Sequence, residues 1–288
     1  SYNTVSENDI INNSGNGVDL SYSSSYNTIA ANNITGNGGG IYMGLSSDHN
    51  AISENSITSN GEGIYIYNSM YNSLSGNNIT NNNGLGIGLL AAKNTVLRNN
   101  RMVGNYHNFY LEGSALESYV NDVDSSNTME GKPVYYWVNQ QYMEVPSDAA
   151  YVALVNCCNI TVKGLELRNN SHAIQIVNTV QSLITNNTVA DNGHGIWLYY
   201  GSSSNTISNN NIQNNTGCGI FLYYMTSSNT ICGNNITGNY NGIALLSSLS
   251  NNKIYHNNFI NNTIDAAAGT PNFWDNGYPS GGNYWSKY

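Results

Sequence analysis

The feature that most constrains the fold is a motif that recurs every 22 to 24 residues along most of the chain. Each copy reads N-x-apolar-x-x-N-x-apolar-x-x-N and then G-I-x-apolar, as in the segments that begin at Tyr26, His49, Ser204 and Ser228. Short apolar pairs separated by Asn and Gly favour strands and turns over helices. Because a unit this small cannot bury its apolar face alone, the copies must stack. We therefore expect an all-β chain folded as a right-handed, single-stranded parallel β-helix, a solenoid of about ten to twelve coils.

Two columns of equivalent residues follow from the repeat. The first apolar positions are Val5, Ile29, Ile52, Leu74, Val96, Val162, Ile184, Ile207, Ile231 and Ile254. The residues three positions later are Asn8, Asn32, Asn55, Asn77, Asn99, Asn187, Asn210, Asn234 and Asn257, with Leu165 in the remaining coil. Amide side chains stacked at strand spacing can donate to and accept from one another and satisfy turn backbone groups. We expect these asparagines to form a structural ladder.

The spacing of the repeats also suggests how the chain is organised. The interval from Val96 to Val162 is three times the usual length, so it holds two further coils or one coil with an insertion. We expect one β-helix domain over 1–288, with coils in 1–113, an insertion and hairpin in 114–149, coils in 150–263 and a capping tail in 264–288. The chain starts in mid-repeat, which suggests either preceding residues or end-to-end contact with a second copy.

The charge balance excludes one class of partner. Only 9% of residues are charged, and 8 Lys and Arg against 17 Asp and Glu give a formal net charge of −9. Nucleic acid is not expected as a ligand, because neutralising phosphates needs a basic surface. No apolar run approaches the ~18 residues that cross a bilayer, so we expect no membrane span in this chain.

Sequons and cysteines bear on location. The four cysteines, Cys157, Cys158, Cys218 and Cys232, lack C-x-x-C spacing and do not fix the redox compartment. N-x-S/T sequons favour an extracellular or cell-surface protein, although a chain this rich in Asn also produces them by chance. The predicted N-glycosylation sites are Asn12, Asn33, Asn78, Asn159, Asn169, Asn186, Asn214, Asn235 and Asn261.

Two segments outside the generic repeat are more specific. They read NDVDSSNTMEGKPVYYW from Asn121 to Trp137 and NFWDNGYPSGGNYWSKY from Asn272 to Tyr288. With the repeat, they make the chain resemble the NosD-like β-helix proteins, which include cell-surface proteins of archaea. The resemblance implies a β-helix fold and an envelope or surface setting. The family's namesake helps to supply copper to nitrous oxide reductase, so copper handling enters as an alternative by analogy of fold alone.

Aromatic residues dominate the outward positions beside each G-I pair. They are predicted to form a binding face, since contiguous exposed aromatics mark interaction sites, and the alternative is stacking that only stabilises the sheet. The predicted face consists of Tyr42, Tyr65, Tyr67, Tyr110, Trp197, Tyr199, Phe221 and Tyr223. The outward acids Asp19 and Glu112 are separated by several coils, which disfavours the paired acid and base of a polysaccharide lyase, hydrolase or epimerase.

Two groups of residues are candidate metal ligands. His172, His194 and Cys218 occupy equivalent turn positions of three consecutive coils and could share Cu or Zn. The simpler alternative is an exposed turn position that tolerates many residues. Asp122 and Asp124 suggest Ca²⁺, although a turn-rich loop without metal explains the same residues.

The function expected from the sequence is a non-catalytic, extracellular or cell-surface β-helix. It would act as a structural, adhesive or carbohydrate-binding module, with cell-surface glycans or other envelope proteins as partners and with end-to-end self-assembly as an option. The first alternative is a carbohydrate-active enzyme, and the second is a copper-binding accessory protein.

Overall fold

The computed structural model describes residues 2–247, 250–268 and 271–287. Residues 1, 248–249, 269–270 and 288, which fall in the predicted coils and tail, lie outside the described residues. The chain divides into two compact units, Ser1–Tyr136 and Trp137–Tyr288, and the boundary falls inside the predicted insertion. The expectation of a single domain stays a prediction, and each unit is described by itself.

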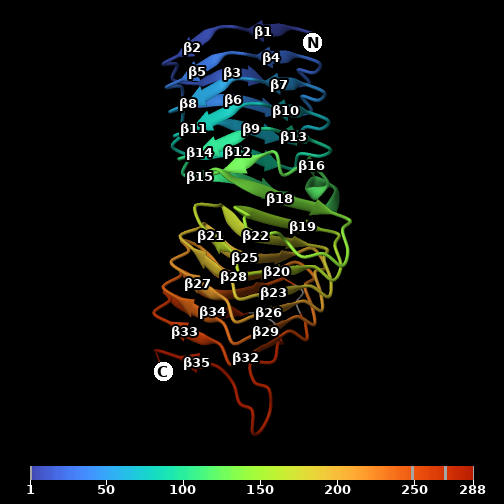
Figure 1. The fold of residues 1–288 in the computed structure, drawn as a ribbon, viewed down its shortest axis with the longest axis vertical. Helices are drawn as coiled ribbons and strands as arrows, with labels where there is room; N and C mark the ends of the chain where they lie inside the picture. The colour runs from blue at the N-terminus through green and yellow to red at the C-terminus, as the bar shows by residue number, and fades with distance from the viewer. Residues whose placement is uncertain (1, 248–249, 269–270, 288) are drawn as a thin grey trace. The chain divides into compact units, whose positions relative to one another are not determined.

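The first unit is built of short strands that stack in three parallel sheets (Figure 1). The first sheet contains β1 (Thr4–Ser6), β4 (Thr28–Ala30), β7 (Ala51–Ser53), β10 (Ser73–Ser75), β13 (Val96–Arg98) and β16 (Asp122–Val123). The second contains β2 (Asp9–Ile11), β5 (Asn33–Thr35), β8 (Ser56–Thr58), β11 (Asn78–Thr80), β14 (Arg101–Val103) and β17 (Thr128–Met129). The third contains β3 (Asn16–Leu20), β6 (Gly39–Gly44), β9 (Ile64–Tyr67), β12 (Leu85–Leu90) and β15 (His107–Glu112).

The predicted insertion begins as part of the stack. After a short 3-10 helix, η1 (Leu116–Tyr119), strands β16 and β17 pair in parallel with β13 and β14. Strand β18 (Lys132–Val138) then pairs antiparallel with β17, whose residues precede the hairpin expected to start at Lys132. The predicted insertion and hairpin over 114–149 stay a prediction.

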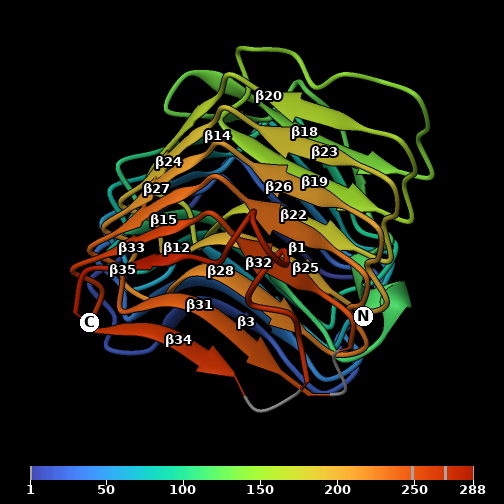
Figure 2. The same cartoon turned by 90° about the horizontal axis from the view of Figure 1, so that it is seen from below.

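The second unit repeats the three-sided plan, and Figure 2 shows its sheets from below. One sheet contains β19 (Tyr151–Val155), β22 (His172–Val177), β25 (His194–Tyr199), β28 (Cys218–Tyr223), β31 (Asn241–Leu246) and β34 (Ile264–Ala268). The next contains β20 (Thr161–Lys163), β23 (Leu183–Thr185), β26 (Thr206–Ser208), β29 (Thr230–Cys232) and β32 (Lys253–Tyr255). The last contains β21 (Glu166–Leu167), β24 (Thr188–Ala190), β27 (Asn211–Gln213), β30 (Asn235–Thr237), β33 (Asn258–Ile260) and β35 (Tyr284–Trp285).

These ladders confirm the predicted parallel β-solenoid. Inward side chains form columns. Ile29, Ile52 and Leu74 pair in register from coil to coil, and each is fully buried. Within the tail, β35 pairs in parallel with β33, and the capping role of 264–288 stays a prediction. The stacked strands extend beyond residue 263, however, since β34 still pairs with β31.

The amide ladder is present, with one error in the predicted register. Leu74 pairs with Leu97, so the anchor in that coil is Leu97 and not Val96. The ladder residue is accordingly Asn100, which is buried, whereas the predicted Asn99 is exposed. The segment Asn94-Thr95-Val96 matches the N-x-apolar motif one residue before the true anchor, which explains the error.

Another amide ladder is broken at the same coil. Asn27, Asn50 and Asn72 lie in one column, in which each Oδ1 accepts from the preceding coil's Asn, and Thr95 then takes the place of the next Asn. Among the described residues, Asn72 Nδ2 and Thr95 Oγ1 are buried without a hydrogen-bond partner. An amide at position 95 would supply the missing acceptor.

We expect Thr95→Asn to raise the free energy of unfolding by about 1–2 kcal/mol, because it satisfies buried polar groups. Urea denaturation monitored by circular dichroism measures the change. The control Thr216→Asn, at an exposed threonine, should leave the midpoint unchanged. A lower midpoint for Thr95→Asn would mean that the larger side chain does not fit the column.

Candidate functional site

A group of contacting aromatic rings lies in the second unit, on adjacent strands β25 and β28 and the turns that follow them. Outward residues pair across the strands, Trp197 with Phe221 and Tyr199 with Tyr223, at ring centroid distances of 5.3 and 5.6 Å. Tyr200 and Tyr224 continue the contact in the next turns, 5.4 Å apart. We call this group the aromatic strip; it consists of Trp197, Tyr199, Tyr200, Phe221, Tyr223 and Tyr224.

The strip is less exposed than predicted. Trp197 and Tyr199 are each only 6% exposed, so the prediction that they are exposed is wrong for these two residues. Neighbouring rings cover them, with His172 lying 4.1 Å from Trp197. Trp197 Nε1 is buried without a hydrogen-bond partner among the described residues. Trp197 therefore serves mainly as a packed base for the rest of the strip.

The accessible part of the strip lies at its turn end. Tyr199 and Tyr223 stack with an interplanar angle of 13°, so their faces largely cover each other. Tyr200 and Tyr224 meet at 35°, and Tyr224 is 40% exposed. The neighbouring Met225 is also exposed. A ligand would thus meet tilted rings and phenolic hydroxyls at this end.

Four predicted aromatic residues lie in the first unit. Tyr42 and Tyr65 stack on β6 and β9 with ring centroids 6.1 Å apart, and Tyr67 is exposed beside them. Burial raises the pKa of the Tyr65 hydroxyl. Tyr110 is separated from Tyr65 by Gly88 and donates a hydrogen bond to Glu112. The structure therefore brings three of these four residues together.

An aromatic stack in the same unit was not predicted. Tyr2, Tyr26, His49 and Tyr71 stack in sequence, with centroid distances of 5.1, 4.9 and 4.9 Å. All four are exposed and have positive φ angles, which bulky side chains rarely adopt. The sequence signal was an aromatic residue directly before the first Asn in four consecutive repeats.

The histidine column lies at the start of strands and not in turns, because His172, His194 and Cys218 are the first residues of β22, β25 and β28. His172 is buried, and its ring centroid lies 5.4 Å from that of His194. The Cys218 backbone N–H donates to His194 Nδ1 at 3.0 Å, and burial raises the pKa of the Cys218 thiol.

These residues do not complete a copper or zinc site as they are placed. Such sites normally need three or four converging ligands. Over the described ranges, no group of three or more His, Cys, Asp or Glu side chains could hold a metal ion. Metal binding at His172 and His194 stays a prediction.

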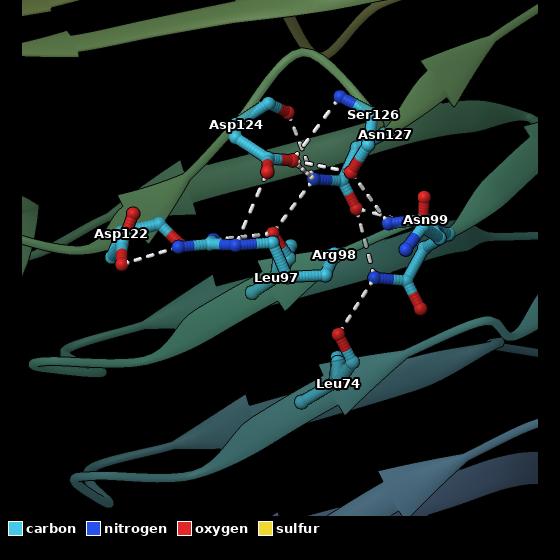
Figure 3. Close-up of polar contacts among 9 residues, drawn as sticks. Leu74, Leu97, Arg98, Asn99, Asp122, Asp124, Ser126 and Asn127 are labelled. Carbon is cyan, nitrogen blue, oxygen red and sulfur yellow. Dashed lines mark hydrogen bonds and ion pairs between the residues drawn. The ribbon is translucent and has the colours of Figure 1, made fainter.

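The two acids proposed for calcium face a single arginine (Figure 3). Arg98 Nη2 lies 2.5 Å from Asp122 Oδ2, and its Nε lies 3.2 Å from Asp124 Oδ2. The Asp124 side chain also accepts from the Ser126 backbone N–H at 3.1 Å. These carboxylates already have a cationic partner that links two coils, and calcium binding there stays a prediction.

The sequon asparagines are accessible. Asn159 and Asn235 are half-buried, and the other seven are exposed. Their glycosylation stays a prediction. Within the part of the chain that is described, no helix is long and apolar enough to cross a membrane.

Comparisons with known proteins come from families and solved structures. The family described as "Periplasmic copper-binding protein (NosD)" matches residues 1–136 and 143–288. No curated protein matches the chain.

Similar solved structures include the A-module of a mannuronan C-5 epimerase from Azotobacter vinelandii, with 15% identity, 90% of this chain and 77% of that chain covered, and a TM-score of 0.39. A pectate lyase has 13% identity, coverage of 94% and 72%, and a TM-score of 0.38. A surface adhesin of Streptococcus pneumoniae has 13% identity, coverage of 86% and 82%, and a TM-score of 0.36. Scores this low carry no conclusion about function.

Proposed function

The chain belongs to the NosD family, and from this premise we propose that it is a non-catalytic β-solenoid that binds carbohydrate through the aromatic strip. The family's description as periplasmic supports a location outside the cytoplasm. The observation that carries the proposal is the strip itself, a group of six contacting rings with an exposed end at Tyr224 and Met225. Display at the cell surface, envelope-protein partners and end-to-end assembly stay predictions.

The chemistry of the strip favours binding over catalysis. Exposed aromatic patches mark interaction sites, and tilted tyrosine rings offer both an apolar surface and a polar hydroxyl. A sugar ring presents the matching surfaces, C–H groups on its faces and hydroxyls on its rim. The enzyme alternative needs a paired acid and base. Asp19 and Glu112 lie on β3 and β15, the two edge strands of one sheet, and are therefore too far apart to act as such a pair.

The copper alternative comes from the family's description and finds less support in the chain. His194 Nδ1 already accepts a hydrogen bond from the Cys218 backbone. The Cys218 thiol is buried, and its raised pKa disfavours the thiolate that would bind a soft ion. We therefore place carbohydrate binding first.

We expect Tyr224→Asn to weaken binding to the best ligand of a glycan array by about tenfold, which is the loss of roughly one good aromatic contact. Asn is chosen because Tyr224 has a φ of 51°, a conformation that Asn tolerates. The measurement is isothermal titration calorimetry with the array ligand.

The matched control is Tyr240→Asn, which removes an exposed tyrosine of the same unit that lies outside the strip. Tyr240→Asn should bind as the wild type does. Equal affinity of Tyr224→Asn and wild type would rule out the strip as the binding surface, and a glycan array without any bound sugar would overturn carbohydrate binding altogether.

A further inference from the structure

The outer face of the third sheet of the first unit gathers tyrosines and acids. Asp19, Tyr42 and Tyr65 lie level with one another on the adjacent strands β3, β6 and β9. All three are at least partly accessible to solvent. We call this surface the tyrosine-acid face; it consists of Asp19, Tyr42, Glu62, Tyr65, Tyr67 and Glu112.

Two glycines allow the tyrosine rings to lie low on the sheet. A Cβ at Gly44 would lie 2.3 Å from Tyr42 Oη, and a Cβ at Gly88 would lie 2.5 Å from Tyr65 Cδ2. Each ring therefore covers backbone that carries no side chain. Both tyrosines are only half-buried, so the side of each ring that is turned away from the backbone is accessible. The sheet thus presents two neighbouring aromatic surfaces, with ring centroids 6.1 Å apart and an interplanar angle of 23°.

The charge around these rings is negative. Burial raises the pKa of the Tyr42 hydroxyl, and the charge of Asp19 raises it further. Burial also raises the pKa of the Tyr65 hydroxyl, with further contributions from the charges of Glu62 and Glu112. Strands β3, β6, β9, β12 and β15 contain no Lys or Arg, and no ion pair among the described residues involves any of the three acids. A cationic partner would therefore complement this face.

The carboxylates have neutral donors and can accept further hydrogen bonds. Asn16 Nδ2 donates to Asp19 Oδ2 at 3.0 Å, and the Ser21 hydroxyl donates to Asp19 Oδ1. The Leu85 backbone N–H donates to Glu62 Oε2 at 3.3 Å. An ionised carboxylate has about four acceptor positions, so each of these acids can also accept from a cation.

The combination of ring and carboxylate favours arginine as the cation. A guanidinium is planar, stacks on an aromatic face and donates two parallel hydrogen bonds to a carboxylate. Tyr42 with Asp19 on the neighbouring strand offers both surfaces. Tyr65 offers them again with Glu62, the acid whose charge acts most strongly on its hydroxyl.

The spacing of the two rings indicates how the arginines are arranged. An extended chain places residues i and i+2 on the same side, roughly 6.6 Å apart. This matches the 6.1 Å between the centroids of Tyr42 and Tyr65. A second copy of this chain does not supply such a pair, because its arginines are Arg98, Arg101 and Arg168, and no two of them are separated by one residue. The occupant is thus a different protein.

We propose that the tyrosine-acid face binds an extended segment of a partner protein that carries two arginines separated by one residue. The two guanidinium groups stack on Tyr42 and Tyr65 and pair with Asp19 and Glu62. This site is separate from the aromatic strip and does not depend on the strip binding a glycan.

The test titrates the full chain into fluorescein-labelled Ser-Arg-Ser-Arg-Ser at low ionic strength and follows fluorescence anisotropy. This peptide should bind saturably. The isomer Ser-Ser-Arg-Arg-Ser should bind about tenfold more weakly, because adjacent side chains of an extended chain point to opposite sides. Spermidine, which tests a free polyamine as the occupant, should displace the first peptide only at higher concentration than the same peptide without its label.

Asp19→Asn should weaken binding of the first peptide by about tenfold without lowering the unfolding midpoint, because Asp19 is exposed. Tyr42→Leu should also weaken binding. The matched control is Glu7→Gln, which removes an exposed acid between β1 and β2 and should bind as the wild type does. The strip variant Tyr224→Asn should also bind the peptide normally, so failure of the strip and failure of this face give different results.

Four outcomes would overturn the proposal. They are the absence of saturable peptide binding, equal affinity for the two isomers, stronger binding of spermidine than of the first peptide, and an equal effect of Asp19→Asn and Glu7→Gln. The last outcome would mean that the peptide responds only to the net charge of the chain.

Discussion

Asn100→Ala is expected to lower the free energy of unfolding by about 3 kcal/mol, because it leaves several buried polar groups without partners. Asn100 Oδ1 accepts from both the backbone N–H and Nδ2 of Asn77, at 3.2 and 2.9 Å. Its Nδ2 donates to Leu74 O at 2.9 Å and to Asn127 Oδ1 at 2.8 Å. Alanine removes all four bonds and interrupts the ladder across three coils. Urea denaturation gives the change in free energy.

The adjacent Asn99 provides the matched control. Its side chain is exposed, and its φ of 54° suits glycine, so Asn99→Gly should change the free energy of unfolding by less than about 0.5 kcal/mol. The two variants together also test the register. If Asn99→Gly were the more damaging one, the ladder would run through position 99 and the pairing of Leu74 with Leu97 would be incorrect.

The solenoid was predictable because its repeat couples two requirements in one motif. Apolar residues such as Ile29 and Ile52 recur at the spacing that stacks them, and Asn32 and Asn55 recur where a turn needs amides. The predicted register was wrong at Asn94-Thr95-Val96, where the motif and the spacing of buried apolar residues no longer coincide. There the motif is present in the sequence, but burial selects Leu97 over Val96.

The candidate site was less predictable because exposure depends on neighbours that one repeat does not reveal. Alternation correctly placed Trp197 and Tyr199 on the outer side of their strand. It could not show that rings of adjacent coils and turns would cover them. The burial of Asp265 was not predicted, for a related reason. Among the described residues, β34 is the last strand of its sheet, and one repeat does not reveal which coil is the last.

Gly63→Ala is expected to destabilise the first unit by about 3 kcal/mol, through overpacking between coils. A Cβ at Gly63 would lie 2.3 Å from Gly86 O and 2.6 Å from Ile79 Cγ2. The backbone atom cannot move without breaking the stacking of β9 on β12. Thermal unfolding followed by circular dichroism measures the effect, and Gly15→Ala, where a Cβ meets nothing within 4 Å, should be neutral.

Gly63 belongs to a column of glycines that occupy the same position in successive coils. Each column ends at the last strand of its sheet, which supports the interpretation that stacking leaves no room for a side chain at this position. Gly63 and Gly86 are followed by Asn108 on β15, an edge strand of its sheet, and Gly242 is followed by Asp265 on β34. Side chains appear in the column where that crowding is relieved. Two residues of the second unit depart from this rule, since Ala173 is level with Gly195 and Tyr151 is level with Ala173 in the same column. If Gly63→Ala were as stable as the wild type, the spacing between neighbouring coils could increase enough to accept a Cβ, and the glycines would not be needed for close approach.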